Sequence, residues 1–218
     1  MKLENKILRI TCDGGAATGK STGAKLIANK FNLSYLSSGL LYRYASYMIL
    51  KKKPKNIESF LKNKFKSLKI TSLKKLNLHS QKISAHSAMI AKKLKVRIIL
   101  KKYQKRYIRK NKRCVLEGRD ASTKILPSSD VKFFFICNLD VAARRRYKEL
   151  KKTAKKIKFQ DVKLALYQRN KMDKNRKNSP LQKHRDAVVV DTGKLNKQAM
   201  LSKMSKHVEK VLKNKYGE

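Results

Sequence analysis

The stretch Gly14-Gly15-Ala16-Ala17-Thr18-Gly19-Lys20-Ser21 matches the phosphate-loop pattern G-x-x-x-x-G-K-[ST]. The branched apolar residues of 7–12 before it predict a β-strand, and Ala24, Leu26-Ile27 and Phe31 after it recur at helical spacing. A chance match in a glycine-rich turn would not require these flanks. The motif therefore lies at a strand-to-helix turn, and it points to an α/β fold built around a phosphate-binding loop.

Such a loop binds the phosphates of a nucleoside triphosphate. Glycines let the backbone curl so that several N–H groups point at the phosphates, and the helix that follows adds the positive end of its dipole. Lys20 can reach the β- and γ-phosphates, and the Ser21 hydroxyl can ligate Mg²⁺. We therefore expect ATP and Mg²⁺ to bind here, with Ser21 as a metal ligand. The expected nucleotide-binding residues are Gly14, Gly15, Ala16, Ala17, Thr18, Gly19, Lys20, Ser21 and Thr22.

Strand-like and helical segments alternate along the rest of the chain. Near-continuous apolar runs, typical of parallel strands covered on both faces, occur at 7–12, 114–117, 131–137 and 187–190. Helical patterns occur at 20–29, 40–50, 88–110, 139–152, 161–173 and 196–213. This alternation predicts a single P-loop domain spanning 1–218, with a doubly wound parallel sheet of about five strands flanked by helices.

The pattern changes between Lys51 and about Ala85. Lys51-Lys52-Lys53-Pro54 breaks the preceding helix, and short alternating pieces follow at 65–70 and 76–83. These pieces suit β-strands, although Leu73-Lys74-Lys75-Leu76 also suits a helix. We expect a small inserted subdomain over 51–85.

The chain carries 57 Lys and Arg against 14 Asp and Glu, which gives a net charge of +43. Charge of this sign usually indicates nucleic acid or anionic membrane partners. It is spread along the predicted helices rather than gathered in one arm, which favours a solvated lysine surface. A basic P-loop protein that binds RNA or ribosomes remains the alternative. We expect weak, non-specific association with polyanions and no specific nucleic acid.

Cysteine spacing and hydropathy bound the environment of the protein. Cys12, Cys114 and Cys137 are odd in number, lack the spacing of metal ligands and lie in apolar segments, which favours reduced thiols. No apolar run approaches the roughly 20 residues that a membrane span requires. Residues 1–6 are charged and have no signal-type apolar region beside them. We expect a soluble, cytoplasmic, monomeric protein without a membrane partner.

Several short motifs follow the phosphate loop in order. They are Ser38-Gly39-Leu40-Leu41-Tyr42-Arg43, Glu117-Gly118-Arg119-Asp120, the Arg-rich segment 142–150, the set Arg169, Asp173 and Arg176, then Ser179-Pro180-Leu181 and 186–192. Each is weak alone. Together, with Asp13-Gly14 at the loop, they resemble the bacterial cytidylate kinases, nucleoside-monophosphate kinases of the P-loop class.

The resemblance implies transfer of the γ-phosphate of ATP to CMP or dCMP, an acceptor-binding role for 51–85, and a helical lid over 144–175. Transfer of this group mostly requires positioning and charge compensation, and arginine forks bind phosphate oxygens bidentately. The implied catalytic residues are Lys20, Arg144, Arg169 and Arg176. The implied acceptor-binding residues are Ser38, Gly39, Tyr42, Arg43, Arg97, Gly118, Arg119, Asp120, Arg169, Asp173 and Arg176.

Some roles stay open at the level of sequence. Three consecutive helical positions span about 300°, so the arginines of 144–146 cannot all face one ligand. Asp120 and Asp173 either contact the nucleotide or order the arginines as ion pairs. Ser37 replaces the aspartate usual before the S-G-x-x-Y-R serine, and Ala88 replaces a serine of the family. The choice among CMP, dCMP and UMP is therefore open.

Overall fold

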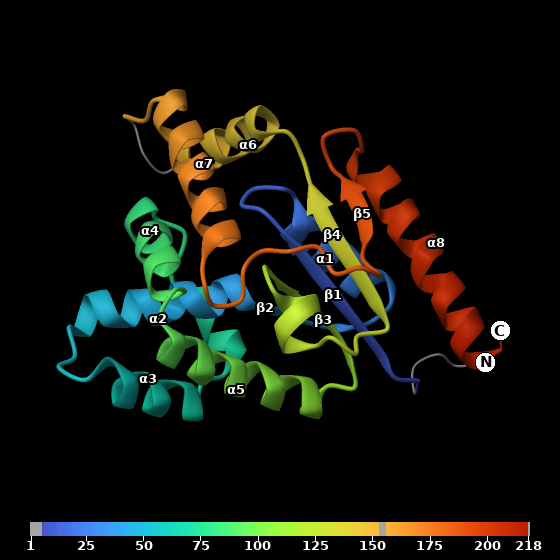
Figure 1. The fold of residues 1–218 in the computed structure, drawn as a ribbon, viewed down its shortest axis with the longest axis horizontal. Helices are drawn as coiled ribbons and strands as arrows, with labels where there is room; N and C mark the ends of the chain where they lie inside the picture. The colour runs from blue at the N-terminus through green and yellow to red at the C-terminus, as the bar shows by residue number, and fades with distance from the viewer. Residues whose placement is uncertain (1–5, 153–155, 218) are drawn as a thin grey trace.

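Five parallel strands form one sheet in the computed structural model, which describes residues 6–152 and 156–217 (Figure 1). The strand order is β2-β3-β1-β4-β5, so the strand that leads into the phosphate loop is central. The strands are β1 (Leu8–Gly14), β2 (Ser34–Ser37), β3 (Arg113–Gly118), β4 (Val131–Ile136) and β5 (Val188–Asp191). The predicted α/β class and doubly wound parallel sheet are confirmed.

The register of the sheet brings the predicted site segments together at the carboxyl ends of the strands. Asp13 in β1 is paired with Gly118 in β3, and Gly14 is paired with Phe135 in β4. The carboxyl ends of β1 and β3 therefore lie side by side, where parallel α/β sheets bind their ligands. The phosphate loop and the segment that begins at Glu117 leave the sheet at this shared edge.

Helices cover both faces of the sheet (Figure 1). Side chains alternate across β3, so Val115 packs with the cluster under α1 (Lys20–Lys30) and α8 (Lys197–Tyr216), and Cys114 and Leu116 pack on the opposite face. That opposite face carries α2 (Ser38–Lys52), α3 (Ile57–Lys66), the 3₁₀ helix η2 (Ile70–Lys75), α4 (Gln81–Ile90) and α5 (Leu94–Lys110). A third apolar cluster joins α6 (Leu139–Lys151) and α7 (Phe159–Asn175) above the phosphate loop.

The four strands assigned from sequence are present with shifts of one or two residues at their ends. The sequence predicted about five strands but gave ranges for only four, so the position of the fifth, β2, was not predicted. Its sequence Ser-Tyr-Leu-Ser has a single fully buried apolar side chain, Leu36, so it lacks the apolar run that marks the others. Its place at the edge of the sheet, paired with β3 alone, explains why it needs little apolar surface.

No strand occurs at 65–70 or 76–83, so the strand interpretation was wrong: these pieces fall at helix ends and in the loops between α3, η2 and α4. The helical alternative for 73–76 agrees with η2, which covers Ile70–Lys75. The Asn56 side chain accepts a hydrogen bond from the Ser59 N–H and caps α3, and Leu61 and Phe65 are buried four residues apart on one face of that helix. The bounds 51–85 and 144–175 remain predictions. Residues 153–155 of the expected lid and residues 1–5 lie outside the described residues.

The helix predicted over 88–110 is two helices, α4 and α5, joined at Ala91–Lys93. The Ala91 carbonyl accepts a hydrogen bond from Arg97 at 3.1 Å, where a continuous helix would use the N–H of Lys95. This break turns the start of α5 and brings Arg97 toward the carboxyl edge of the sheet.

The structure also bears on the expectations about the cysteines and about membrane spans. Cys12, Cys114 and Cys137 are free thiols; the first two are buried and Cys137 is partly exposed, just after β4. Among the described helices, none has both the length and the apolar character that crossing a bilayer demands.

Candidate active site

The phosphate loop takes its shape from glycines at its two ends. A Cβ at Gly14 would overlap the Phe135 carbonyl oxygen, so β1 and β4 can approach each other here only without a side chain. Gly19 has φ of 77°, a left-handed conformation that glycine adopts without strain, and it is the N-cap of α1. The loop therefore ends in a helix N-terminus whose N–H groups are available to phosphate.

Lys20 lies folded against this loop. Its Nζ donates a hydrogen bond to the Gly15 carbonyl at 3.0 Å, and its side chain is almost fully buried. Burial, assisted by the nearby charge of Arg119, lowers the pKa of Lys20 to about 7. An anion bound in the loop would therefore stabilise the charged form of Lys20.

Glu117 contacts both Ser21, the predicted metal ligand, and Lys20, the predicted phosphate ligand. Its Oε1 accepts a hydrogen bond from Ser21 Oγ at 2.9 Å and lies 3.7 Å from Lys20 Nζ, while its Oε2 accepts from the Tyr35 hydroxyl. Burial alone would raise the pKa of Glu117, but Lys20 and the two hydroxyl donors outweigh it and hold the pKa below its usual range. Hydroxyl and carboxylate oxygens are ligands that Mg²⁺ prefers, so Ser21 and Glu117 fit this ion.

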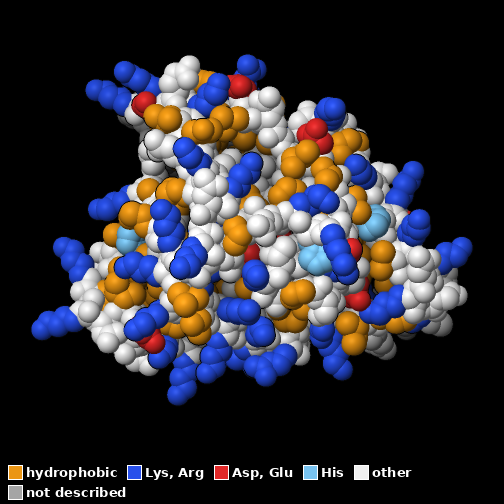
Figure 2. Space-filling view, in the orientation of Figure 1, with side chains coloured by type: hydrophobic (Ala, Val, Ile, Leu, Met, Phe, Trp, Pro, Cys, Tyr) orange, Lys and Arg blue, Asp and Glu red, His pale blue; other side chains and the backbone are white. Residues whose placement is uncertain are grey.

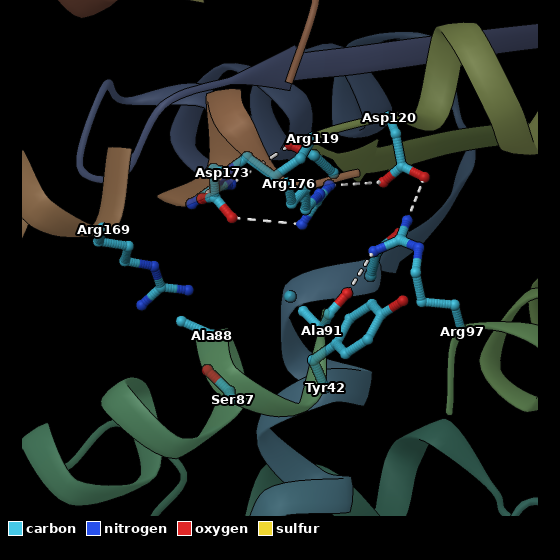
Figure 3. A pocket seen from close by; sticks show the side chains of 13 residues that line it. Tyr42, Ser87, Ala88, Ala91, Arg97, Arg119, Asp120, Arg169, Asp173 and Arg176 are labelled. Atoms are coloured by element: carbon cyan, nitrogen blue, oxygen red, sulfur yellow. Dashed lines mark hydrogen bonds and ion pairs between the residues drawn. The ribbon is translucent and has the colours of Figure 1, made fainter. Parts of the chain in front are cut away.

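A cavity that is open to solvent lies beside the loop. Its walls come from α2, α4, the start of α5, α7 and the end of β3 (Figure 3). It brings together ten of the eleven predicted acceptor-binding residues: Ser38, Gly39, Tyr42, Arg97, Gly118, Arg119, Asp120, Arg169, Asp173 and Arg176. Ser87, Ala88 and Ala91 complete the lining. The remaining predicted residue, Arg43, is held nearby.

Five charged side chains on the cavity wall alternate in sign. Asp120 pairs with Arg97 and, at 3.4 Å, with Arg176. Asp173 pairs with Arg176 at 3.2 Å and with Arg119 at 2.9 Å (Figure 3). The ion-pair role that the sequence left open for both aspartates is therefore present, and nucleotide contact by either remains a prediction. The network fixes three arginine forks at the wall and carries one net positive charge.

Arg169 and Arg43 add further positive charge to the site. The charges of Asp173 and Glu117 act on them, but within the described part of the chain no ion pair joins either arginine to a carboxylate. Arg169 Nε is buried and has no hydrogen-bond partner among the described residues. Burial and the neighbouring Arg119 lower the pKa of Arg169 to about 10. Arg43 donates to the Leu78 carbonyl and to Ser84 Oγ, and burial together with Arg169 lowers its pKa to about 9. Burial and neighbouring arginine charges thus lower the pKa of both side chains. A phosphate group bound here would supply the negative charge that compensates them.

The three arginines of 144–146 diverge on α6, as their spacing requires. Arg144, the predicted catalytic lid arginine, is exposed. Arg145 donates to Thr192 Oγ1 at 2.8 Å and to its carbonyl at 2.7 Å, and Thr192 Oγ1 donates in turn to the Thr18 carbonyl in the phosphate loop. Arg146 reaches the His79 carbonyl at 3.0 Å. Arg145 is therefore a better candidate than Arg144 for contact with the donor.

Sequence reasoning assigned no role to two polar residues that hold this site together. Buried Asp13 accepts hydrogen bonds from the N–H groups of Ala121 and Ser122 and from the Ser122 hydroxyl, so it anchors the π-helical turn η3 (Ala121–Ile125) that follows Asp120. Asn170 accepts from the Ala16 N–H of the phosphate loop at 2.9 Å. Asp13 could have been noticed as a carboxylate at the end of an apolar strand, but Asn170 carries no such signal.

Comparison with known proteins adds an independent observation. A profile of the family described as cytidylate kinase matches residues 10–210. Cytidylate kinases of Clostridium tetani and Thermosipho melanesiensis are each 34% identical to the chain, over 95% and 94% of it and 96% and 98% of their own lengths. That of Rickettsia akari is 31% identical over 94% of the chain and 93% of its own. This chain belongs to the cytidylate kinase family.

Solved structures agree on the fold of this cytidylate kinase family member. An uncharacterized protein from Eubacterium ventriosum superimposes with a TM-score of 0.56 at 15% identity, covering 94% of this chain and 99% of that one. A Thermus thermophilus protein gives 0.50 at 15% identity, covering 94% and 97%. At these identities the likeness concerns the backbone arrangement alone.

The two departures from the cytidylate kinase pattern have structural roles. Ser37 is the N-cap of α2, and its Oγ accepts a hydrogen bond from the Leu40 N–H at 3.3 Å. Ala88 lines the cavity with a methyl group, while the hydroxyl of adjacent Ser87 donates to the Ser84 carbonyl at 2.8 Å. The α4 wall of the cavity is thus more apolar than it would be with a serine at position 88.

Proposed function

We propose that the protein transfers the γ-phosphoryl group of ATP to CMP or dCMP, giving ADP and the corresponding diphosphate. The observation that carries this proposal is the adjacency of two anion sites, the phosphate loop with Lys20 and the arginine-lined cavity with Arg169. Arg119 joins them, because it lines the cavity and its charge depresses the pKa of Lys20. A phosphate donor and a phosphate acceptor could therefore meet at this boundary.

The residues supply positioning and charge. The N–H groups of the loop and Lys20 would hold the donor phosphates, while Arg43, Arg119 and Arg169 would hold the phosphate of the acceptor. An oxygen of that phosphate then attacks the γ-phosphorus in line as the bond to the ADP oxygen breaks. Developing charge on the transferred group is met by cations already fixed in place, which minimises reorganisation.

Mg²⁺ belongs to this proposal as the ion that accompanies the triphosphate. Ser21 Oγ and Glu117 Oε1, which are 2.9 Å apart, would hold it, either directly or through water. When bound, the ion neutralises charge on the donor phosphates. Tyr35 keeps Glu117 turned toward Ser21 by binding its other oxygen.

A panel of acceptors tests the proposal. Purified protein with ATP and Mg²⁺ is given CMP, dCMP, UMP or AMP, and ADP formation is followed by a coupled assay. We expect CMP and dCMP to be phosphorylated with the highest kcat/KM. Absence of transfer to every pyrimidine monophosphate would contradict the proposal. We also propose a cytoplasmic monomer, which sedimentation and fractionation would test.

A further inference from the structure

Helix α7 lies between the two anion sites and contacts both. Arg169 lines the acceptor cavity (Figure 3). The next residue, Asn170, contacts the phosphate loop. Consecutive residues of an α-helix point about 100° apart, so one turn of α7 can serve two different sites. The acceptor arginine and a ligand of the donor loop therefore share one rigid element.

The contact between Asn170 and the loop is short and specific. Asn170 Oδ1 accepts the Ala16 N–H at 2.9 Å, and a Cβ placed on Gly15 would lie 3.1 Å from the same oxygen. Ala16 also packs with Val162 and Leu166 of α7 in one apolar cluster. A movement of α7 would therefore carry the loop with it, or would cost this hydrogen bond.

The Arg169 side chain, about 100° around the helix from Asn170, has a buried donor, Nε, without a hydrogen-bond partner among the described residues. The neighbouring charges of Arg119 and Arg43 repel its guanidinium. A monophosphate would supply oxygen acceptors and negative charge at this point. Acceptor binding should therefore fix Arg169 and, through the backbone, the position of Asn170.

We propose that Asn170 is a positioning residue that couples the two substrates: its hydrogen bond to Ala16 transmits the ordering of Arg169 to the donor loop. The inference rests on the proposed function, since it needs a donor and an acceptor. Coupling of this kind is reciprocal, so each substrate tightens the binding of the other by the same factor. Sequence alone gives Asn170 no such role, because its partner is 154 residues away.

The test measures the coupling rather than either affinity. Calorimetry gives the Kd of CMP for the whole protein with and without saturating Mg²⁺ and β,γ-imido-ATP, and the ratio of the two Kd values is the coupling factor. We expect about fivefold or more in the wild type and less than about twofold in Asn170→Ala. Asn170→Asp keeps an oxygen acceptor, so it should retain coupling even though its charge weakens binding of the triphosphate.

Lys171→Ala is the matched control, because Lys171 is the exposed neighbour of Asn170 on the same helix. Thermal melting establishes that each variant is folded, and Asn170→Ser, whose hydroxyl is shorter, replaces the alanine variant if that one melts. Coupling lost with alanine or serine but kept with aspartate and in the control supports the inference.

Three results would overturn it. The first is an unchanged coupling factor in Asn170→Ala, and the second is a wild type whose substrates bind independently or antagonistically. In the third, Lys171→Ala loses coupling to the same extent, which would indicate a general disturbance of α7. If neither CMP nor any other monophosphate of the panel binds the wild type, the proposed function falls as well, and this result is distinct from the other three.

Discussion

Lys20 is the residue whose chemistry depends most on its surroundings. Its ammonium group is buried and feels the charge of Arg119; it donates a hydrogen bond to the Gly15 carbonyl and lies 3.7 Å from Glu117 Oε1. The position is unfavourable for a charge in the free protein and favourable once a polyanion is present. The site is therefore organised for its ligand at some cost to the stability of the unliganded fold.

The depressed pKa of Lys20 makes triphosphate binding dependent on pH. The pKa is about 7 in the free protein and should rise toward its usual value beside the phosphates, so the complex binds more protons above pH 7. Affinity for Mg²⁺ and ATP should therefore fall as pH rises through this range. Calorimetry at about pH 8 in buffers of different ionisation enthalpy should detect proton uptake.

Lys20→Ala provides the control for this pH dependence. It should abolish the proton uptake and lower phosphoryl transfer by about 10²–10³-fold while the fold survives. Equal proton uptake in the variant would assign the titration to another group, and near-normal turnover would remove Lys20 from the catalytic set.

Arg169 should act on the acceptor side of the reaction. In Arg169→Ala the acceptor phosphate loses a charged hydrogen-bond donor, so kcat/KM for CMP should fall about 10–100-fold, with both a higher KM and a lower kcat. The KM for ATP should change less. Steady-state kinetics at varied CMP and fixed ATP measure this, and unchanged values for CMP would exclude Arg169 from the site.

At the scale of elements, the close approach of α1 to β4 sets the position of the phosphate loop. A Cβ on Gly23 of α1 would lie 2.6 Å from the ring of Phe135, which is fully buried. The backbone and Cβ of Phe135 also lie against Gly14 at the start of the loop. Two glycines thus let one phenylalanine pack beneath the loop and hold the start of α1 against the sheet.

Gly23→Ala should destabilise the fold. The overlap with Phe135 should lower the free energy of unfolding by about 1–3 kcal/mol, despite the higher helix propensity of alanine. Gly39→Ala is the matched helical control, since its Cβ would meet only Ser37 Oγ at 3.7 Å. Urea denaturation measures both variants, and equal stability of the two would contradict the packing argument.

At the scale of the whole molecule, the dominant feature is the net charge of +43. Lys and Arg side chains occur over all parts of the face drawn in Figure 2. No single patch on that face favours the RNA-binding alternative. Such a field would attract anionic nucleotides, and it opposes compaction through self-repulsion.

Salt should therefore stabilise this protein. Raising NaCl from about 0.02 to 0.2 M screens the repulsion and should raise the Tm by about 3–6 °C. Sulfate at equal ionic strength should raise it further, because it can also occupy the phosphate loop and the arginine-lined cavity. Differential scanning fluorimetry measures both effects, and a Tm that falls with salt would show that attractive surface pairs dominate.

Much of the fold and the donor half of the site follow from local sequence. The phosphate loop, its flanking strand and its helix need only residues 7–31, because glycine conformations and apolar periodicity act over short distances. Arg169 and Asp173 are spaced by four residues within α7, so the helix places them on one side, and Arg176 follows as the C-cap of that helix. These features could be predicted without knowing what packs against them.

The tertiary structure decided the features that depend on distant partners. β2 is a strand because it pairs with β3. The start of α5 is fixed by Arg97, which donates a hydrogen bond to the Ala91 carbonyl and forms an ion pair with Asp120. Glu117 and Asn170 act through residues 96 and 154 positions away, Ser21 and Ala16. Local propensity cannot specify such contacts, because their free energy arises only when the packed core brings those segments together.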